Sequence, residues 1–277
     1  MTPIVLAALS ALIWGTADYS GGRASQRAHP LAVTVISQTL CLPTLVLCMI
    51  LLPGTPTAAD LAWGASSGLA GFVGIVLLYR ALAGGAMAVV APLAAVTAAI
   101  VPIGVGLLTD SFPGTLALGG AGLAVVAIGL VSLTPHAGRT AVSPRLIMMS
   151  LVAGVFFGLF FALLGQSSEG AGMWPLAAGR LTSVAVGAAI LLGTRTAARL
   201  PRPALAWTAV AGTLEIVANA FYLAAAVRGH LSVVAAIAAL YPASTVLLAL
   251  AVDRERLRPI QIAGLGLAAT ALVLATT

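Results

Sequence analysis

One acidic residue, Glu215, lies deep inside a long apolar run of the sequence, where a charge is costly. It stands about 11 residues into the run 204–227, near the middle of a helix long enough to cross a bilayer. A carboxylate at that depth costs at least about 2.5 kcal/mol, so it should face a partner or a cavity. Asn219 and Tyr222 follow at i+4 and i+7, on the same helical stripe. The stripe predicts either a site for substrate or proton coupling, or a hydrogen-bond network between helices.

Arg180 is the other charge well inside an apolar run, about six residues into 174–194. Its planar guanidinium is suited to binding a carboxylate. Two alternatives remain open: a buried ion pair with Glu215, or a side chain that extends towards the membrane interface. If Arg180 and Glu215 share one cavity, they are placed to bind the two ends of a zwitterion.

Aromatic residues and one further acid complete the candidate binding residues. Trp14 and Asp18 share a helix face at i, i+4, and Asp18 is expected near the end of its run as a solvated charge. Trp14, Tyr79, Tyr222 and Tyr241 are candidates for the walls of a cavity. Aromatic rings beside a carboxylate suit organic cations.

Motifs for covalent chemistry are missing from the sequence. It has no Gly-rich phosphate loop, no cluster of metal ligands and no nucleophile next to a base. The three histidines, His29, His136 and His230, are too dispersed for a metal site. We therefore expect a protein that is not an enzyme and uses neither a metal nor a cofactor. An integral-membrane enzyme and a passive channel are the alternatives from other classes.

The composition requires a membrane environment for these residues. Of 277 residues, 61% are apolar and 7% are charged, and the mean hydropathy is +1.12. A soluble domain carries about 25% charged residues, so a soluble globular fold is excluded. The net charge of +6 comes entirely from arginine, because the sequence has no lysine. These arginines lie between apolar runs, which indicates membrane topology rather than nucleic-acid binding.

Gly, Pro and charged residues divide the chain into ten apolar runs of about 20 residues, the length that crosses a bilayer. The runs lack the alternation of a membrane barrel, so they predict an all-α polytopic membrane protein with ten transmembrane helices. The expected spans are 3–20, 31–52, 60–82, 86–108, 114–134, 145–165, 174–194, 204–227, 230–252 and 259–276.

The two halves of the chain show a weak internal repeat. Residues 87–95 align with 231–239 at an offset of 144, which also superposes Gly120 and Gly122 on Gly264 and Gly266. Five spans per half require the repeats, 1–138 and 139–277, to be inverted in the membrane, a common plan of secondary transporters. We expect them to surround a central cavity, with the fifth and tenth spans at the periphery. Small residues spaced like Gly64 and Gly68 indicate close helix packing within the bundle or, alternatively, a dimer interface.

The positions of the arginines set the expected orientation. Eleven of the 13 lie in the loops that follow odd-numbered spans, and only Arg228 lies in a loop on the opposite side. By the positive-inside rule the arginine-rich loops are cytoplasmic, and both termini are therefore predicted outside.

Several short motifs resemble the drug/metabolite transporter superfamily, specifically its ten-helix EamA-type permeases. They are Trp14-Gly15, Tyr241-Pro242, Glu255-Arg256-Leu257 with Gln261 and Gly264, the weaker Asp110-Ser111-Phe112, and Arg180 with its first-half equivalent Gln38. The resemblance implies a permease of the bacterial cytoplasmic membrane that moves a small polar or amphipathic metabolite, such as an amino acid, amine or drug, by alternating access. It favours export, with import of a small organic cation or nutrient as the alternative. The expected partners are the substrate, a proton and the lipid bilayer, for a monomer or homodimer that binds no nucleic acid.

Overall fold

The computed structural model describes residues 2–83, 87–109, 114–131, 143–241, 244 and 259–275, and within these ranges the chain is helical and has no strand. The first half contains α1 (Thr2–Ser25), α2 (Pro30–Leu40), α3 (Leu42–Leu51), α4 (Ala58–Ala83), α5 (Met87–Thr109) and α6 (Thr115–Val131). The second contains α7 (Pro144–Leu164), the short 3-10 helix η1 (Glu169–Ala171), α8 (Trp174–Gly193), α9 (Arg202–Ala226), α10 (Leu231–Ala238) and α12 (Pro259–Ala275).

Proline explains several helix boundaries. Helices α2, α7, α8 and α9 each carry proline at the first or second position, where the missing N–H costs nothing. The span expected as one helix at 31–52 is divided into α2 and α3 at Cys41. Pro43 follows this break and has no N–H to donate to the carbonyl of Thr39, so the regular helical ladder is interrupted there.

Among the residues that the structure describes, six segments are long and apolar enough to cross a membrane, namely α1, α2 together with α3, α4, α7, α8 and α9. Helices α5 and α6 contain shorter apolar stretches, Leu93–Leu108 and Leu118–Ala127. The last part of the span expected at 230–252, beyond Tyr241 except for Ser244, lies outside the described residues, as do the motifs Asp110-Ser111-Phe112 and Glu255-Arg256-Leu257. The apolar helices fit a multi-pass membrane protein.

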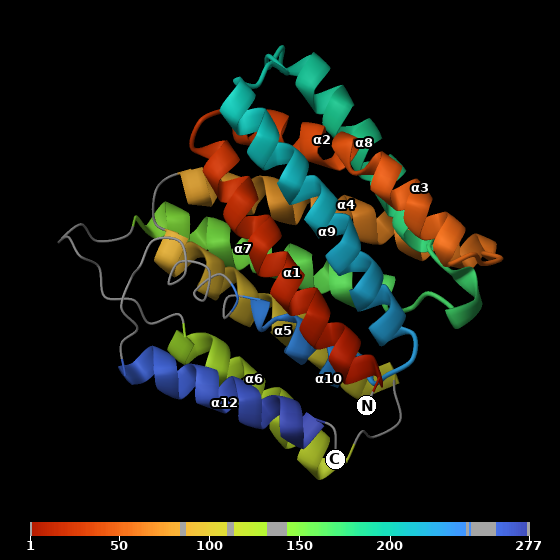
Figure 1. Cartoon of the computed structure of the whole chain (residues 1–277), viewed down its shortest axis with the longest axis vertical. Coiled ribbons are helices and arrows are strands. Elements are labelled where there is room, and N and C mark those ends of the chain that lie inside the picture. Colours follow the sequence, from red (N-terminus) through yellow and green to blue (C-terminus); the bar gives the residue numbers. More distant parts are fainter. Residues whose placement is uncertain are drawn as a thin grey trace.

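Helices from the two halves pack against each other throughout the molecule. α1 contacts α9, α4 lies against α7 and α8, α5 against α7, and α2 against both α8 and α9. α6 and α12 pair with each other along one edge of the bundle (Figure 1). The core is therefore built between the halves rather than separately within each.

Small residues allow these close approaches. A side chain on Gly64 or Gly68 of α4 would collide with backbone atoms of Pro175 or Gly179 in α8. Gly154 of α7 approaches the backbone of α5 in the same way. In membranes, such glycines let helix backbones touch and gain dispersion energy. Packing within the bundle thus explains the spacing of Gly64 and Gly68.

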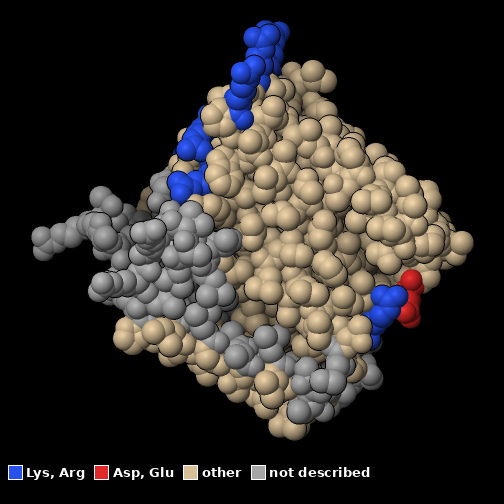
Figure 2. Space-filling model, viewed as in Figure 1, with Lys and Arg blue, Asp and Glu red and all other residues tan. Residues whose placement is uncertain are grey.

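Charged side chains gather at the two ends of the bundle. Figure 2 shows basic side chains along one edge of the molecule, and an acidic side chain next to a basic one at the opposite edge. Arg228, just beyond the end of α9, pairs with Glu169 of η1, with 2.8 Å between Nε and Oε1. The opposite end carries Arg195 and Arg199, which lie between α8 and α9.

Candidate binding site

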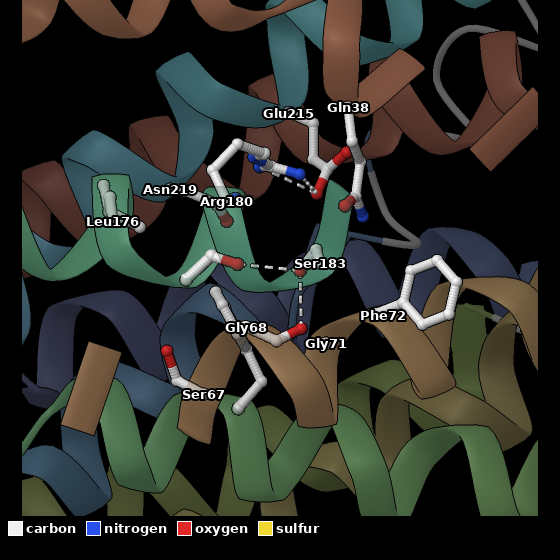
Figure 3. Close-up of a pocket in the computed structure, with 12 residues that line it drawn as sticks. Gln38, Ser67, Gly68, Gly71, Phe72, Leu176, Arg180, Ser183, Glu215 and Asn219 are labelled. Carbon is white, nitrogen blue, oxygen red and sulfur yellow. Dashed lines mark hydrogen bonds and ion pairs between the residues drawn. The ribbon is translucent and has the colours of Figure 1, made fainter. Parts of the chain in front are cut away.

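A buried ion pair joins α8 and α9 in the interior of the bundle. Nη1 and Nη2 of Arg180 both lie 3.2 Å from Oε1 of Glu215 (Figure 3). The side chains are only 6% and 13% exposed. A buried charge is strongly unfavourable without a partner, so each residue needs the other while the site is closed. The sequence left several roles open for Arg180, and the structure shows the ion pair with Glu215.

The ion pair faces a small cavity, which we call the Arg180 cavity. Its walls come from α2, α4, α7, α8 and α9. It is lined by Gln38, Ser67, Gly68, Gly71, Phe72, Phe160, Leu176, Gly179, Arg180, Ser183, Glu215 and Asn219. Its volume of about 20 Å³ has room for about one water molecule. The helices are therefore closed around the charges in this conformation.

Three buried oxygen atoms at the Arg180 cavity have no hydrogen-bond partner among the described residues. They are Oε1 of Gln38, Oε2 of Glu215 and Oδ1 of Asn219. Leaving such an atom unpaired costs about 1–3 kcal/mol, and native structures have few of them. A carboxylate oxygen can only accept, whereas the two amides can rotate to present either oxygen or nitrogen. The cavity wall therefore has unused capacity to bind a donor group.

Corresponding positions of the two halves meet around this cavity. Gly68 and Gly212 stand 144 positions apart. A side chain on Gly68 would collide with the carbonyl oxygen of Gly179, and one on Gly212 with that of Ser37. Each of these two backbone partners immediately precedes a cavity residue, Arg180 in α8 and Gln38 in α2. Glu215 and Gly71, which stands 144 positions earlier, also both line the cavity.

Comparisons with known proteins identify the family of the second half. The sequence model of the EamA-like transporter family matches residues 144–277, from α7 to the end of the chain. This half of the chain belongs to the EamA-like transporter family. The match contains Arg180, Glu215 and Asn219. Membership indicates a membrane transporter of the drug/metabolite type and confirms the resemblance seen in the sequence.

Solved structures share the fold of the whole chain. Twenty-two chains match, and one crystal structure superposes with a TM-score of 0.77, covering 99% of this chain and 96% of its own. Its sequence is 15% identical, so the likeness concerns the fold alone. No curated protein matches this EamA-like chain.

The predicted aromatic residues lie behind the cavity instead of lining it. The Trp14 ring lies 5.1 Å from that of Phe161 and 6.2 Å from that of Tyr222, measured between centroids. Tyr222 donates a 3.0 Å hydrogen bond to the carbonyl of Phe161. The ring of Tyr241 lies 6.4 Å from Trp14. Only Phe160, which the sequence analysis did not select, belongs to this cluster and also lines the cavity.

Asp18 and Tyr79 are also absent from the cavity wall. Helix α1 continues to Ser25, almost two turns beyond Asp18, so Asp18 is half-buried on the helix instead of at its end. The expectation of a solvated helix-end charge was therefore wrong. Tyr79 is fully buried, with its hydroxyl against the backbone of Gly21. Of the nine predicted site residues, the cavity brings together Gln38, Arg180, Glu215 and Asn219.

Sequence reasoning missed the small residues of the wall. The single hydroxyl proton of Ser183 in α8 is shared between two carbonyl oxygens, that of Gly68 at 2.7 Å and that of Gly179 at 2.9 Å, and so joins α8 to α4 (Figure 3). Gly71 carries no chemical group, but it stands one repeat offset before Glu215. Applying the 144-residue offset to each polar candidate would have selected it.

Proposed function

We propose that this protein is a secondary active transporter that exports a small zwitterionic metabolite by alternating access. The observation that carries the proposal is the buried Arg180–Glu215 pair beside three unpaired acceptor oxygens. Arg180 would bind the substrate carboxylate, and Glu215, Gln38 and Asn219 would accept hydrogen bonds from its ammonium group. Export is the direction favoured by the family resemblance.

The balance of charge supports a zwitterion over an ion of one sign. Arg180 and Glu215 together are neutral, and their surroundings are apolar and buried. A bound zwitterion keeps the site neutral and replaces one ion pair by two. A monocation or a monoanion would leave a net charge in a region of low dielectric, which is costly. Such an ion would have to exchange with a proton, for which Glu215 is the candidate carrier.

The size and position of the cavity support alternating access. Organic ligands occupy pockets of about 300–1,000 Å³, far above the roughly 20 Å³ of the closed cavity. A substrate can therefore enter only when helices separate. The matching contacts of Gly68 with Gly179 and of Gly212 with Ser37 support ten helices in two inverted repeats that alternate around this point.

Binding of matched ligands tests the substrate class. We expect an α-amino acid to raise the melting temperature of the purified protein by a few degrees at about 100 times its Kd. The corresponding amine without the carboxylate, and the acid without the ammonium group, should give no shift. Stabilisation by the amine alone would instead favour the organic-cation alternative. If a broad set of zwitterions fails to bind, the proposed substrate class is wrong.

The distribution of arginines gives a separate prediction of orientation. We propose that the end with Arg195 and Arg199 faces the cytoplasm of a bacterial cell, which puts both termini outside. A C-terminal alkaline phosphatase fusion should then be active and a C-terminal green fluorescent protein fusion dark. The reverse pattern would contradict the orientation without affecting the site.

A further inference from the structure

Two loops from different halves of the chain are joined by a buried carboxylate. Asp60, at the start of α4, is 2% exposed. Its Oδ2 accepts hydrogen bonds from the backbone N–H of Thr57 (2.8 Å) and from the hydroxyls of Thr57 (2.7 Å) and Ser168 (3.0 Å). Its Oδ1 accepts one from the backbone N–H of Ser168 at 2.7 Å. Asp60 thus caps its own helix and holds the loop between α7 and α8.

Backbone contacts strengthen this junction. The N–H of Thr55 donates to the carbonyl of Gly170 at 2.9 Å, and Nε1 of Trp174 donates to the carbonyl of Gly54 at 3.1 Å. A side chain on Gly54 would collide with the backbone at Gly172, which itself has a left-handed φ of 56°. The two loops therefore touch along their backbones.

The junction lies at the start of two helices that line the Arg180 cavity. Its loops lead into α4 and α8, which supply eight of the twelve lining residues. Ser67 follows Asp60 by seven residues, about 10 Å of helix. Leu176 and Arg180 lie in the first two turns of α8. Separating the loops would therefore move apart the two helices that enclose the site.

We propose that Asp60 and these loop contacts form a latch that closes the Arg180 cavity from this end of the molecule. The inference rests on the proposed function as a transporter. It assigns Asp60 a role in setting the balance between the two open states, although Asp60 does not contact the site.

The opposite end has no matching latch side chains at the repeat-related positions. At the 144-residue offset, Thr57 and Asp60 correspond to Pro201 and Ala204, at the start of α9. Neither has a side chain that can form a hydrogen bond. The latch therefore favours closure at the Asp60 end, and its loss should shift the population towards opening there.

Labelling of a cavity cysteine tests the latch without any substrate. We would replace Cys41 and Cys48 with Ala and introduce Ser67→Cys, a near-isosteric change in the cavity wall. An exposed Thr55→Cys control identifies the membrane face that carries the Asp60 end. In this background, we expect Asp60→Ala to raise the rate of Ser67→Cys labelling by an impermeant thiol reagent from that face, by about tenfold or more.

Two further variants separate the latch from general loosening. Ser168→Ala removes one of the four hydrogen bonds to Asp60 and should give a smaller increase from the same face. Glu169→Gln, in the same loop, breaks only the exposed pair with Arg228 and should leave the rate unchanged. An unchanged rate in both folded Asp60→Ala and Ser168→Ala, or equal increases from both faces, would overturn the proposal. Because labelling needs no transport, this result stands apart from the substrate test.

Discussion

Replacing Arg180 with Met is expected to destabilise the protein by about 3–5 kcal/mol, because it leaves the Glu215 carboxylate buried without its partner. Replacing both residues with Met should recover most of that loss, since a well-packed apolar pair often replaces a buried ion pair at little cost. Transport should fall at least about 100-fold in both variants, because each lacks Arg180 and the double variant lacks Glu215 as well. Thermal melting in detergent and substrate uptake into proteoliposomes measure the two effects independently.

The double variant distinguishes a functional pair from a structural one. If Arg180 and Glu215 only join α8 to α9, Arg180→Met/Glu215→Met should be stable and should still transport at a rate near that of the wild type. That outcome would refute the binding site. Glu215→Gln adds a finer measurement, because it keeps the shape and removes the exchangeable proton. It should abolish uptake driven by a pH gradient, and full retention of that uptake would exclude Glu215 as the proton carrier.

Replacing Gly68 or Gly212 with Val should have the largest effect on folding. The added atoms would collide with backbone carbonyls, of Gly179 in one case and Ser37 in the other, and backbone atoms cannot move aside as a flexible side chain can. The helix crossings α4–α8 and α9–α2 would have to separate, and the dispersion energy of close packing would be lost. We expect little or no folded protein, measured as monodisperse material in gel filtration.

A glycine in open space supplies the matched control. Gly104 of α5 is exposed, and a side chain there would meet nothing within 4 Å. Gly104→Val should therefore yield folded protein in amounts close to those of the unchanged chain. If Gly68→Val and Gly212→Val folded equally well, the close helix crossings around the cavity would be incorrect.

The sequence by itself determined the helical membrane class, because 7% charge and long apolar runs permit no other arrangement of hydrogen-bonded backbone. It also determined the positions of most helices, since proline and glycine interrupt the chain locally. The break at Cys41 depends on Pro43, which the apolar run as a whole conceals. Glu215 and Arg180 could be identified because a charge inside an apolar run is energetically costly and requires a partner or a function.

Only the tertiary structure decided which polar groups meet. Trp14, Tyr79 and Tyr222 are of residue types that often line a cavity. In the structure they pack instead against Phe161 and Gly21. The sequence around Asp60 indicates only an acidic residue at the start of a helix. Its hydrogen bonds with Ser168, 108 positions away, depend on how the two halves pack against each other. A sequence fixes periodicity along one helix, but the rotation and depth of each helix against its neighbours arise from packing between segments far apart in the chain.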